Sequence, residues 1–353
     1  MVAGNLTLWL VDTRSIWPGD SIKEAAADAL RLLPTQDQVN VQRKHFIADA
    51  RMSLASALLK RFYISRTLRL PWSDIAIARR GDPKHGKPAA LLPDGSFAKI
   101  DFNVSHQGGL VTLIGWAPEE DMSTVSSTGS APSVSVGTDI TLVNERDDYR
   151  TIDAEGIDGF VDVFADVFSD GERFDMAYTV DYLTLLDGRI VPGSVMGRAD
   201  RVLKRGQIVS VNVPGQDGRP SETIEFDSEL ITEAKLRRFY SFFAYKEAYI
   251  KLEGEALLAP WLKELEFRNV SSPRPGSPAR CSTAGLWGER VDDVEVFLKG
   301  KKVKDTQMDL RAYDEGFVIA SAIKGDADVR LEDYKIETIN VDDMLEHART
   351  HTR

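Results

Sequence analysis

The chain has 353 residues, 42% of them hydrophobic, and a formal net charge of −11 at pH 7. This length and composition allow one large or two medium domains, and the acidic balance disfavours binding to nucleic acid. No apolar run approaches the roughly 18 residues of a membrane span, so we expect no membrane association. The single cysteine excludes an internal disulfide, argues against a zinc site and favours a reducing, cytoplasmic setting.

The amino-terminal part of the chain predicts a mixed α/β unit. Residues 6–13, LTLWLVDT, alternate like a strand and lack the basic residues that begin a signal peptide. A short helix is expected next, ending near Pro34. Residues 45–68 carry apolar side chains at helical spacing and predict a long packed helix. The alternating segment 72–80 predicts a further strand.

A β-hairpin is predicted after the basic loop that follows this strand. Residues 102–107 and 110–117 are strand-like, and Gly108 and Gly109 between them suit a tight turn. The acidic, Ser/Thr-rich segment near 118–134 predicts a surface linker.

The rest of the chain predicts a second α/β half, so we divide the sequence into 1–134 and 135–353. The Gly- and Pro-rich segment near 186–230 resembles an insertion or a partly disordered excursion. Helices are expected at 160–174, 233–254 and 341–350, and strands at 134–146, 207–213, 264–270, 294–300, 316–324 and 334–341. Helix followed by strands occurs in both halves. The predicted fold is therefore α/β (α+β), a pseudo-dimer of two similar halves with largely antiparallel sheets and an active site at their seam.

Cations gather on the loop RRGDPKHGKP, which holds Arg79, Arg80, Lys84, His85 and Lys87 between glycines and prolines. Such a loop suits phosphate, because charge-assisted hydrogen bonds are roughly twice as strong as neutral ones. The glycine spacing fits neither a Walker A loop nor a Rossmann fingerprint. A solvated basic loop is the alternative.

The strand FNVSHQ carries an unusual polar row. Ser105 and His106 are adjacent, so they point to opposite faces and cannot form a nucleophile pair. Asn103, Ser105 and Gln107 share one face and lead into two glycines. That pattern suits a strand that approaches a ligand, or a hydrogen-bonded structural strand.

Two carboxylates stand in otherwise apolar surroundings. Asp139 lies within a strand that reads as buried, where a lone carboxylate is costly unless it is paired or bound to a cation. Glu247 and Lys251 are four residues apart and share one face of an aromatic-rich helix. A strand aspartate and a helix glutamate are typical of a sparse magnesium site. The alternative for Glu247 and Lys251 is a solvated pair worth about 0.2–0.5 kcal/mol.

Four motifs in order resemble the signatures of Sfp-type 4′-phosphopantetheinyl transferases, fungal broad-range members in particular. They are GKP at 86–88, FNVSHQ at 102–107, VGTDI at 136–140 and YKEAYIK at 245–251. The resemblance implies transfer of the 4′-phosphopantetheine arm of coenzyme A to a serine of an apo carrier protein, giving holo carrier and 3′,5′-ADP. It implies Mg²⁺ as cofactor. It also implies, as partners, the carrier domains of fatty-acid, polyketide and nonribosomal peptide synthases, with α-aminoadipate reductase as a further candidate.

The resemblance also assigns roles to residues. Asp139, Glu247 and Gln107 would hold the metal, Glu247 would act as or position the base, and Lys251 would stabilise the departing phosphate. The residues implied to bind coenzyme A are Arg51, Arg80, Lys87, Asn103, Ser105, His106, Asp139, Lys246, Glu247 and Lys251.

The sequence departs from the family pattern at two positions, and one alternative function is open. Thr141 replaces the third carboxylate of many bacterial members, and Phe243 replaces the usual tryptophan of the last motif. A non-catalytic module that binds coenzyme A, a nucleotide or a carrier protein is the alternative. Two internal halves make a monomer sufficient.

Overall fold

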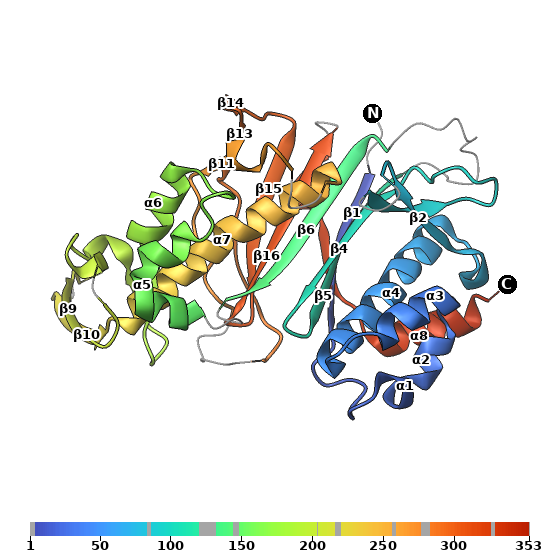
Figure 1. Cartoon of the computed structure of the whole chain (residues 1–353), viewed down its shortest axis with the longest axis horizontal. Helices are drawn as coiled ribbons and strands as arrows, with labels where there is room; N and C mark the ends of the chain where they lie inside the picture. Colours follow the sequence, from blue (N-terminus) through green and yellow to red (C-terminus); the bar gives the residue numbers. More distant parts are fainter. Residues whose placement is uncertain are drawn as a thin grey trace.

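Two four-stranded sheets lie side by side in the middle of the molecule, with helices beyond each of them (Figure 1). The computed structural model describes residues 4–82, 86–119, 132–143, 148–202, 204–215, 220–255, 259–276, 283–325 and 329–352. Lys84, His85 and Cys281, and most of the predicted linker at 118–134, lie outside the described residues.

The first sheet has the strand order β17-β1-β5-β4. Its strands are β1 (Gly4–Asp12), β4 (Asp101–Gln107), β5 (Leu110–Pro118) and β17 (Lys335–Thr338). Only the β1–β17 pair is parallel. The helices on this side are α1 (Ile22–Ala25), α2 (Ala27–Arg31), α3 (Thr35–Gln42), α4 (Ile47–Leu68) and α8 (Val341–Thr350). They share one hydrophobic core with the sheet.

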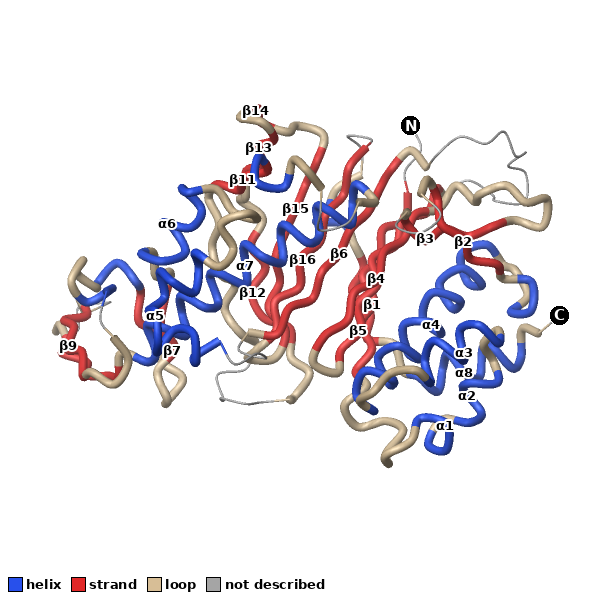
Figure 2. Tube along the Cα trace, in the orientation of Figure 1, coloured by secondary structure: helices blue, strands red, loops and turns tan. Residues whose placement is uncertain are grey.

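The second sheet is antiparallel throughout, in the order β12-β15-β16-β6. Its strands are β6 (Val134–Leu142), β12 (Trp287–Val291), β15 (Thr306–Tyr313) and β16 (Phe317–Gly325). The helices that pack here are α5 (Asp148–Asp162), α6 (Asp170–Tyr178) and α7 (Glu229–Glu253). The helix-free faces of the two sheets meet in further apolar clusters, so the sheets form the centre and the helices the flanks (Figure 2).

Shorter strands and single helical turns lie outside the two four-stranded sheets. The strands are β2 (Ala76–Arg80), β3 (Lys87–Leu91), β7 (Tyr182–Thr184), β8 (Ile190–Pro192), β9 (Ile208–Val213), β10 (Glu222–Asp227), β11 (Leu265–Arg268), β13 (Glu295–Leu298) and β14 (Lys301–Lys302). Single 3₁₀ turns occur at Trp72–Asp74, Gly193–Val195, Asp200–Val202, Leu262–Glu264 and Leu331–Asp333.

Both long helices form where helical periodicity predicts them. α4 begins at Ile47 and buries most of one side against the first sheet. α7 ends at Glu253 and is capped by Gly254, whose φ of 75° is the left-handed conformation that a glycine adopts at a helix C-terminus. The β4–β5 turn falls on Gly108 and Gly109, both with positive φ, as the hairpin prediction requires.

Two helix predictions were wrong in detail. The single short helix ending near Pro34 is two short helices, and Pro34 precedes a third helix, because the fixed φ of proline suits a helix start. The single helix at 160–174 is the end of α5 and the start of α6, since the Ser169 hydroxyl and Glu172 form a capping box that begins a new helix.

The segment near 186–230 is not a partly disordered excursion in the part the structure describes. It forms the β7–β8 and β9–β10 hairpins, and the second of these contains the one strand predicted here. A separate apolar cluster joins the hairpins to the first turn of α7 through Val191, Val211, Phe226 and Leu230. Its burial of apolar side chains is what orders a Gly- and Pro-rich stretch.

The two sheets are joined by polar side chains where β4 meets β6. The backbone N–H of Val136 donates to Asp101 Oδ2 at 2.9 Å, and that of Thr138 donates to Asn103 Oδ1 at 3.1 Å. Side chains of β4 thus bind an edge of β6 that would otherwise leave backbone donors unpaired. Asn103 therefore has the structural, hydrogen-bonded role that was the alternative for the polar side chains of β4. The same contacts bring Ser105 next to β6.

The predicted α/β class with largely antiparallel sheets is confirmed. The pseudo-dimer relation and the division into 1–134 and 135–353 stay predictions. The chain does return to its first half at the end, because β17 pairs with β1 and α8 packs beside α4. In the described part of the chain, no helix is long and apolar enough to cross a membrane.

Candidate active site

Close packing of α7 on β6 creates the site. A Cβ atom at Gly137 would lie 2.2 Å from the carbonyl oxygen of Ala248, so only glycine permits this approach. Asp139 lies two residues further on, on the same face of β6, because strand side chains alternate. Glu247 and Lys251, which flank Ala248 on α7, therefore lie over Asp139.

Asp139 is the centre of a hydrogen-bonded cluster. Its Oδ1 accepts from the Ser105 hydroxyl at 2.8 Å and from Lys251 Nζ at 2.5 Å, and its Oδ2 accepts from the Thr141 hydroxyl at 3.0 Å. Lys251 Nζ also donates to Ser105 Oγ at 2.9 Å. Three elements, β4, β6 and α7, thus contribute to one buried group of charges.

Glu247 lies at the edge of this cluster. Its Oε2 is 4.0 Å from Lys251 Nζ, and its buried Oε1 has no hydrogen-bond partner in the described structure. Burial and the nearby charge of Asp139 raise the pKa of Glu247 to about 7, although Lys251 opposes the shift. An unpartnered carboxylate oxygen with a pKa near neutrality can accept a proton or bind a cation.

A cation-lined cavity of about 250 Å³ adjoins the cluster. Among the described residues, four lysine and arginine side chains and His106 line it, against one carboxylate, that of Glu255. The lining residues are Ser56, Lys60, Arg79, Gly86, Lys87, Pro88, Phe102, Asn103, Val104, His106, Lys251, Gly254 and Glu255. The charge balance favours an anionic ligand.

Lys87 is held rigidly at this cavity. Its ammonium donates to Asp101 and to the carbonyl oxygen of Val136, and the side chain is only 9% exposed. Asp101 also binds the Val136 N–H, so one carboxylate fixes both the lysine and the edge of β6. Burial lowers the pKa of Lys87, and Asp101 opposes the shift.

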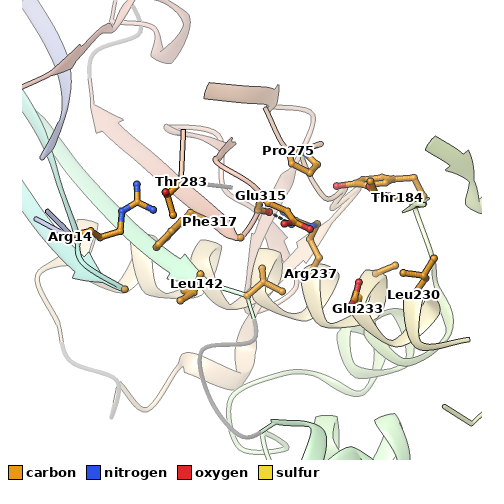
Figure 3. Close-up of a pocket in the computed structure, with 15 residues that line it drawn as sticks. Arg14, Leu142, Thr184, Leu230, Glu233, Arg237, Pro275, Thr283, Glu315 and Phe317 are labelled. Carbon is orange, nitrogen blue, oxygen red and sulfur yellow. Dashed lines mark hydrogen bonds between the residues drawn. The ribbon is translucent and has the colours of Figure 1, made fainter. Parts of the chain in front are cut away.

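A larger cavity, of about 500 Å³, lies at the opposite end of β6 and α7. Figure 3 shows Arg14, Leu142 and Phe317 at one end of it and Thr184 and Leu230 at the other. None of the residues predicted for the site lines this cavity. The charged cluster lies beside the smaller cavity, and we place the candidate site there.

The structure brings together most of the predicted residues. Ser105, Asp139, Glu247 and Lys251 form the cluster described above. Lys87, Asn103, His106 and Lys251 line the adjoining cavity. Burial and the positive charges of Lys44, Lys251 and Lys60 lower the pKa of His106. Gln107 lies two residues beyond Ser105 on the same face of β4.

Three predicted residues lie elsewhere. Lys246 points into the core, where its ammonium donates to three backbone carbonyls and pairs with Glu172 at 3.2 Å. Arg51 donates to the carbonyls of Trp17 and Gly19. Arg80 lies 3.4 Å from Asp101 and over the ring of Phe97. None of the three lines the smaller cavity.

Asp101 and Lys60 were not among the residues predicted from the sequence. Asp101 begins the same alternating row as Asn103 and Ser105, so the strand pattern contained the signal. Lys60 interrupts a run of buried residues in α4, between Leu59 and Arg61. A lysine within such a run is the only sign of its role in the sequence.

The carboxylates fit a sparse divalent-cation site. Among the described residues, no three His, Cys, Asp or Glu side chains gather as a metal cluster. Asp139 and Glu247 are two carboxylates that repel each other, and Glu247 has a buried oxygen without a donor. Hard oxygen donors of this kind suit Mg²⁺, which usually takes only one or two protein carboxylates.

Comparison with known proteins decides the family. Residues 19–117 match the family described as "4′-phosphopantetheinyl transferase, N-terminal". A 4′-phosphopantetheinyl transferase of Aureobasidium melanogenum is 62% identical over 91% of both chains. The chain belongs to the 4′-phosphopantetheinyl transferases. 4′-Phosphopantetheinyl transferase A of Aspergillus fumigatus is 36% identical, over 91% of this chain and 83% of its own. The Emericella nidulans transferase NpgA is 33% identical, over 91% and 82%.

The resemblance to fungal Sfp-type transferases is therefore confirmed, as is the enzyme class. This transferase moves a 4′-phosphopantetheine group. Two of the four motifs, GKP and FNVSHQ, fall in the matched segment. VGTDI and YKEAYIK lie beyond it and supply Asp139, Glu247 and Lys251.

Proposed function

We propose that this transferase moves the 4′-phosphopantetheine arm of coenzyme A to a serine hydroxyl of an apo carrier protein, with Mg²⁺ as cofactor and 3′,5′-ADP as product. The observation that carries the proposal is the placement of Asp139, Ser105, Lys251 and Glu247 directly beside a cation-lined cavity. The cavity suits the nucleotide, and the cluster suits the pyrophosphate.

Cations and hydrogen-bond donors at the cavity would bind the nucleotide half of coenzyme A. Lys87, Asn103 and His106 line it, and Ser105 and Lys251 link it to Asp139. An anion would be bound more strongly here than in water, because the surrounding side chains limit solvent access and the donors are already oriented. Arg51 and Arg80 would act indirectly, through the loops and the Asp101 carboxylate that they hold.

Asp139 and Glu247 would hold Mg²⁺, with Gln107 or water as a further oxygen ligand. When bound, the ion would neutralise charge on the pyrophosphate oxygens. Thr141 donates a hydrogen bond to Asp139 in place of a third carboxylate, so it orients the ligand and adds no charge.

The transfer forms one bond and breaks another. The serine oxygen of the carrier bonds to the phosphorus that bears the pantetheine arm, and the bond from that phosphorus to the bridging oxygen breaks. The electron pair leaves with 3′,5′-ADP. Glu247 accepts or directs the serine proton, which its pKa of about 7 permits near neutral pH. Lys251, whose ammonium donates to Asp139 and Ser105, would stabilise charge on the departing phosphate.

Carrier domains of fatty-acid, polyketide and nonribosomal peptide synthases are the proposed acceptors. A Schizosaccharomyces pombe relative, 30% identical over 37% of this chain, is named L-aminoadipate-semialdehyde dehydrogenase-phosphopantetheinyl transferase. We therefore include the carrier domain of α-aminoadipate reductase as a further acceptor. One chain contains all residues of the proposed site, so a monomer suffices.

A non-catalytic binding module is the alternative. Such a module would need the cation-lined cavity, but not an unpartnered Glu247 carboxylate over Asp139. Burying two repelling carboxylates costs free energy that ligand binding alone does not require.

Intact-mass measurement of a carrier separates these functions. An apo carrier domain is incubated with the protein, coenzyme A and Mg²⁺, and parallel samples lack the protein or contain a chelator. The proposal predicts a gain of one phosphopantetheinyl group only in the complete sample. Binding of coenzyme A without any gain in carrier mass would support the non-catalytic alternative.

A further inference from the structure

Lys60 faces the cation-lined cavity from α4. It lies four residues after Ser56, which places both side chains on one side of the helix, and both line the cavity. The β2–β3 hairpin and the end of α7 also line the cavity, through Arg79, Lys87 and Lys251. Lys60 thus adds a charge from an element that contributes no other cation to this cavity.

The other cations of the cavity already have partners within the protein. Arg79 Nη1 donates to the Gly86 carbonyl at 2.7 Å, Lys87 binds Asp101, and Lys251 binds Asp139 and Ser105. In the described part of the chain, the Lys60 ammonium has no hydrogen bond and no ion pair. Glu255, the one carboxylate among the described lining residues, accepts a hydrogen bond from Trp261.

The surroundings of Lys60 disfavour an isolated charge. Burial lowers the pKa of Lys60, and the positive charges of Arg61 and Arg79 lower it further. Asp37 opposes the shift, but its carboxylate pairs with Arg61 at 3.2 Å. A partly buried cation that two nearby guanidinium groups repel costs free energy in the free protein, and an anion in the cavity would reduce that cost.

We propose that Lys60 binds a phosphate group of coenzyme A and so contributes to selection of the donor. The inference rests on the proposed function, because it takes coenzyme A as the occupant of the cavity. Coenzyme A carries two sources of phosphate, the 3′-phosphate of the ribose and the pyrophosphate. The 3′-phosphate is a monoester with close to two charges at neutral pH, and a lysine suits it as a point charge.

A purely structural lysine would behave differently. Removing a lysine that supports the fold lowers stability, whereas removing an unpaired, desolvated cation does not. Lys60→Met keeps most of the aliphatic length and removes the charge, and both residues favour helices. The two roles therefore predict different outcomes for the ligand-free protein: a lower melting temperature for a structural lysine, and no decrease for a lysine that binds the ligand.

The test measures binding and turnover of Lys60→Met, Lys60→Arg and the control Lys23→Met. Lys23 is an exposed lysine of α1 outside the cavity. Dissociation constants are measured by calorimetry for coenzyme A and for 3′-dephospho-coenzyme A. We expect Lys60→Met to bind coenzyme A about 10- to 100-fold more weakly, as for loss of a hydrogen bond to a charged group. The KM for coenzyme A should rise with little change in kcat, Lys60→Arg should recover part of the affinity, and Lys23→Met should match wild type.

The two donors separate the sources of phosphate. If Lys60→Met loses affinity for coenzyme A but not for 3′-dephospho-coenzyme A, Lys60 binds the 3′-phosphate. If it loses the same affinity for both donors, Lys60 binds the pyrophosphate. Wild-type affinity of Lys60→Met for both donors would overturn the proposal, as would a lower melting temperature of the free variant with unchanged KM. Failure of the wild-type protein to bind coenzyme A would contradict the proposed function itself, and the role of Lys60 with it.

Discussion

Replacing Glu247 by glutamine should change stability and activity in opposite directions. The folded protein raises the pKa of this carboxyl from 4.5 to about 7, chiefly by burial and then by the charge of Asp139. A raised pKa means that the folded state holds the proton more tightly than the unfolded state. The protonated carboxyl therefore contributes stability below pH 4.5, and that contribution is lost as the pH rises to 7.

The size of the effect follows from the two pKa values. Each pKa unit corresponds to about 1.36 kcal/mol, so ionisation of Glu247 lowers the free energy of unfolding by about 3 kcal/mol at pH 8. Glutamine has nearly the same shape and no charge. Without metal, we expect Glu247→Gln to be more stable than wild type by up to about 3 kcal/mol at pH 8, and similar to it near pH 4.5. Transfer should fall by a factor of about 10²–10⁴, since glutamine cannot accept the serine proton.

Urea unfolding with a chelator, at several pH values, measures the first effect, and carrier modification measures the second. The control is Glu229→Gln on the same helix, whose exposed pair with Arg205 is worth about 0–1 kcal/mol. Added Mg²⁺ should stabilise wild type but not Glu247→Gln, because the ion binds only the folded site. A Glu247→Gln protein that is less stable than wild type at pH 8, or that transfers at the wild-type rate, would refute this reasoning.

Three further variants test the remaining contacts. Asp139→Asn should abolish Mg²⁺-dependent transfer while weakening metal-free coenzyme A binding only modestly by calorimetry; normal turnover would contradict its role as a ligand. Lys251→Met should lower kcat for carrier modification by about 10²–10³, as for loss of a transition-state donor, and an unchanged kcat would return Lys251 to a structural role. Lys246→Met should lower the free energy of unfolding by about 3–5 kcal/mol, because it leaves Glu172 buried without its partner; urea unfolding at the wild-type midpoint would show that the pair is dispensable.

Local periodicity was enough to predict which residues could share the site. Alternation in β4 placed Ser105 and His106 on opposite faces, and the four-residue spacing placed Glu247 and Lys251 on one face of α7. Periodicity did not predict the strongest contact. Lys251 lies 2.5 Å from Asp139 and 4.0 Å from Glu247, since close packing at Gly137 brings β6 nearer than the neighbouring turn of the helix.

The remaining residues depend on contacts between distant segments. Lys246 and Glu247 are adjacent, yet a helix turns about 100° per residue, so one side chain enters the core while the other faces Asp139. Asp101 has a role because β6 is the edge strand of its sheet and its Val136 N–H needs an acceptor from β4. No local sequence pattern shows that β6 is an edge strand next to β4. The hairpins near 186–230 form because their sparse apolar residues meet in one cluster across the segment.

Paired quantification of products tests the central claim most directly. The protein is incubated with coenzyme A, Mg²⁺ and an apo carrier domain, and holo carrier and 3′,5′-ADP are measured over time in the same samples. The proposed chemistry predicts that both products rise together in equal amounts, and that neither forms with a carrier whose acceptor serine is alanine. Release of 3′,5′-ADP without holo carrier, or no release at all while coenzyme A stays bound, would contradict it.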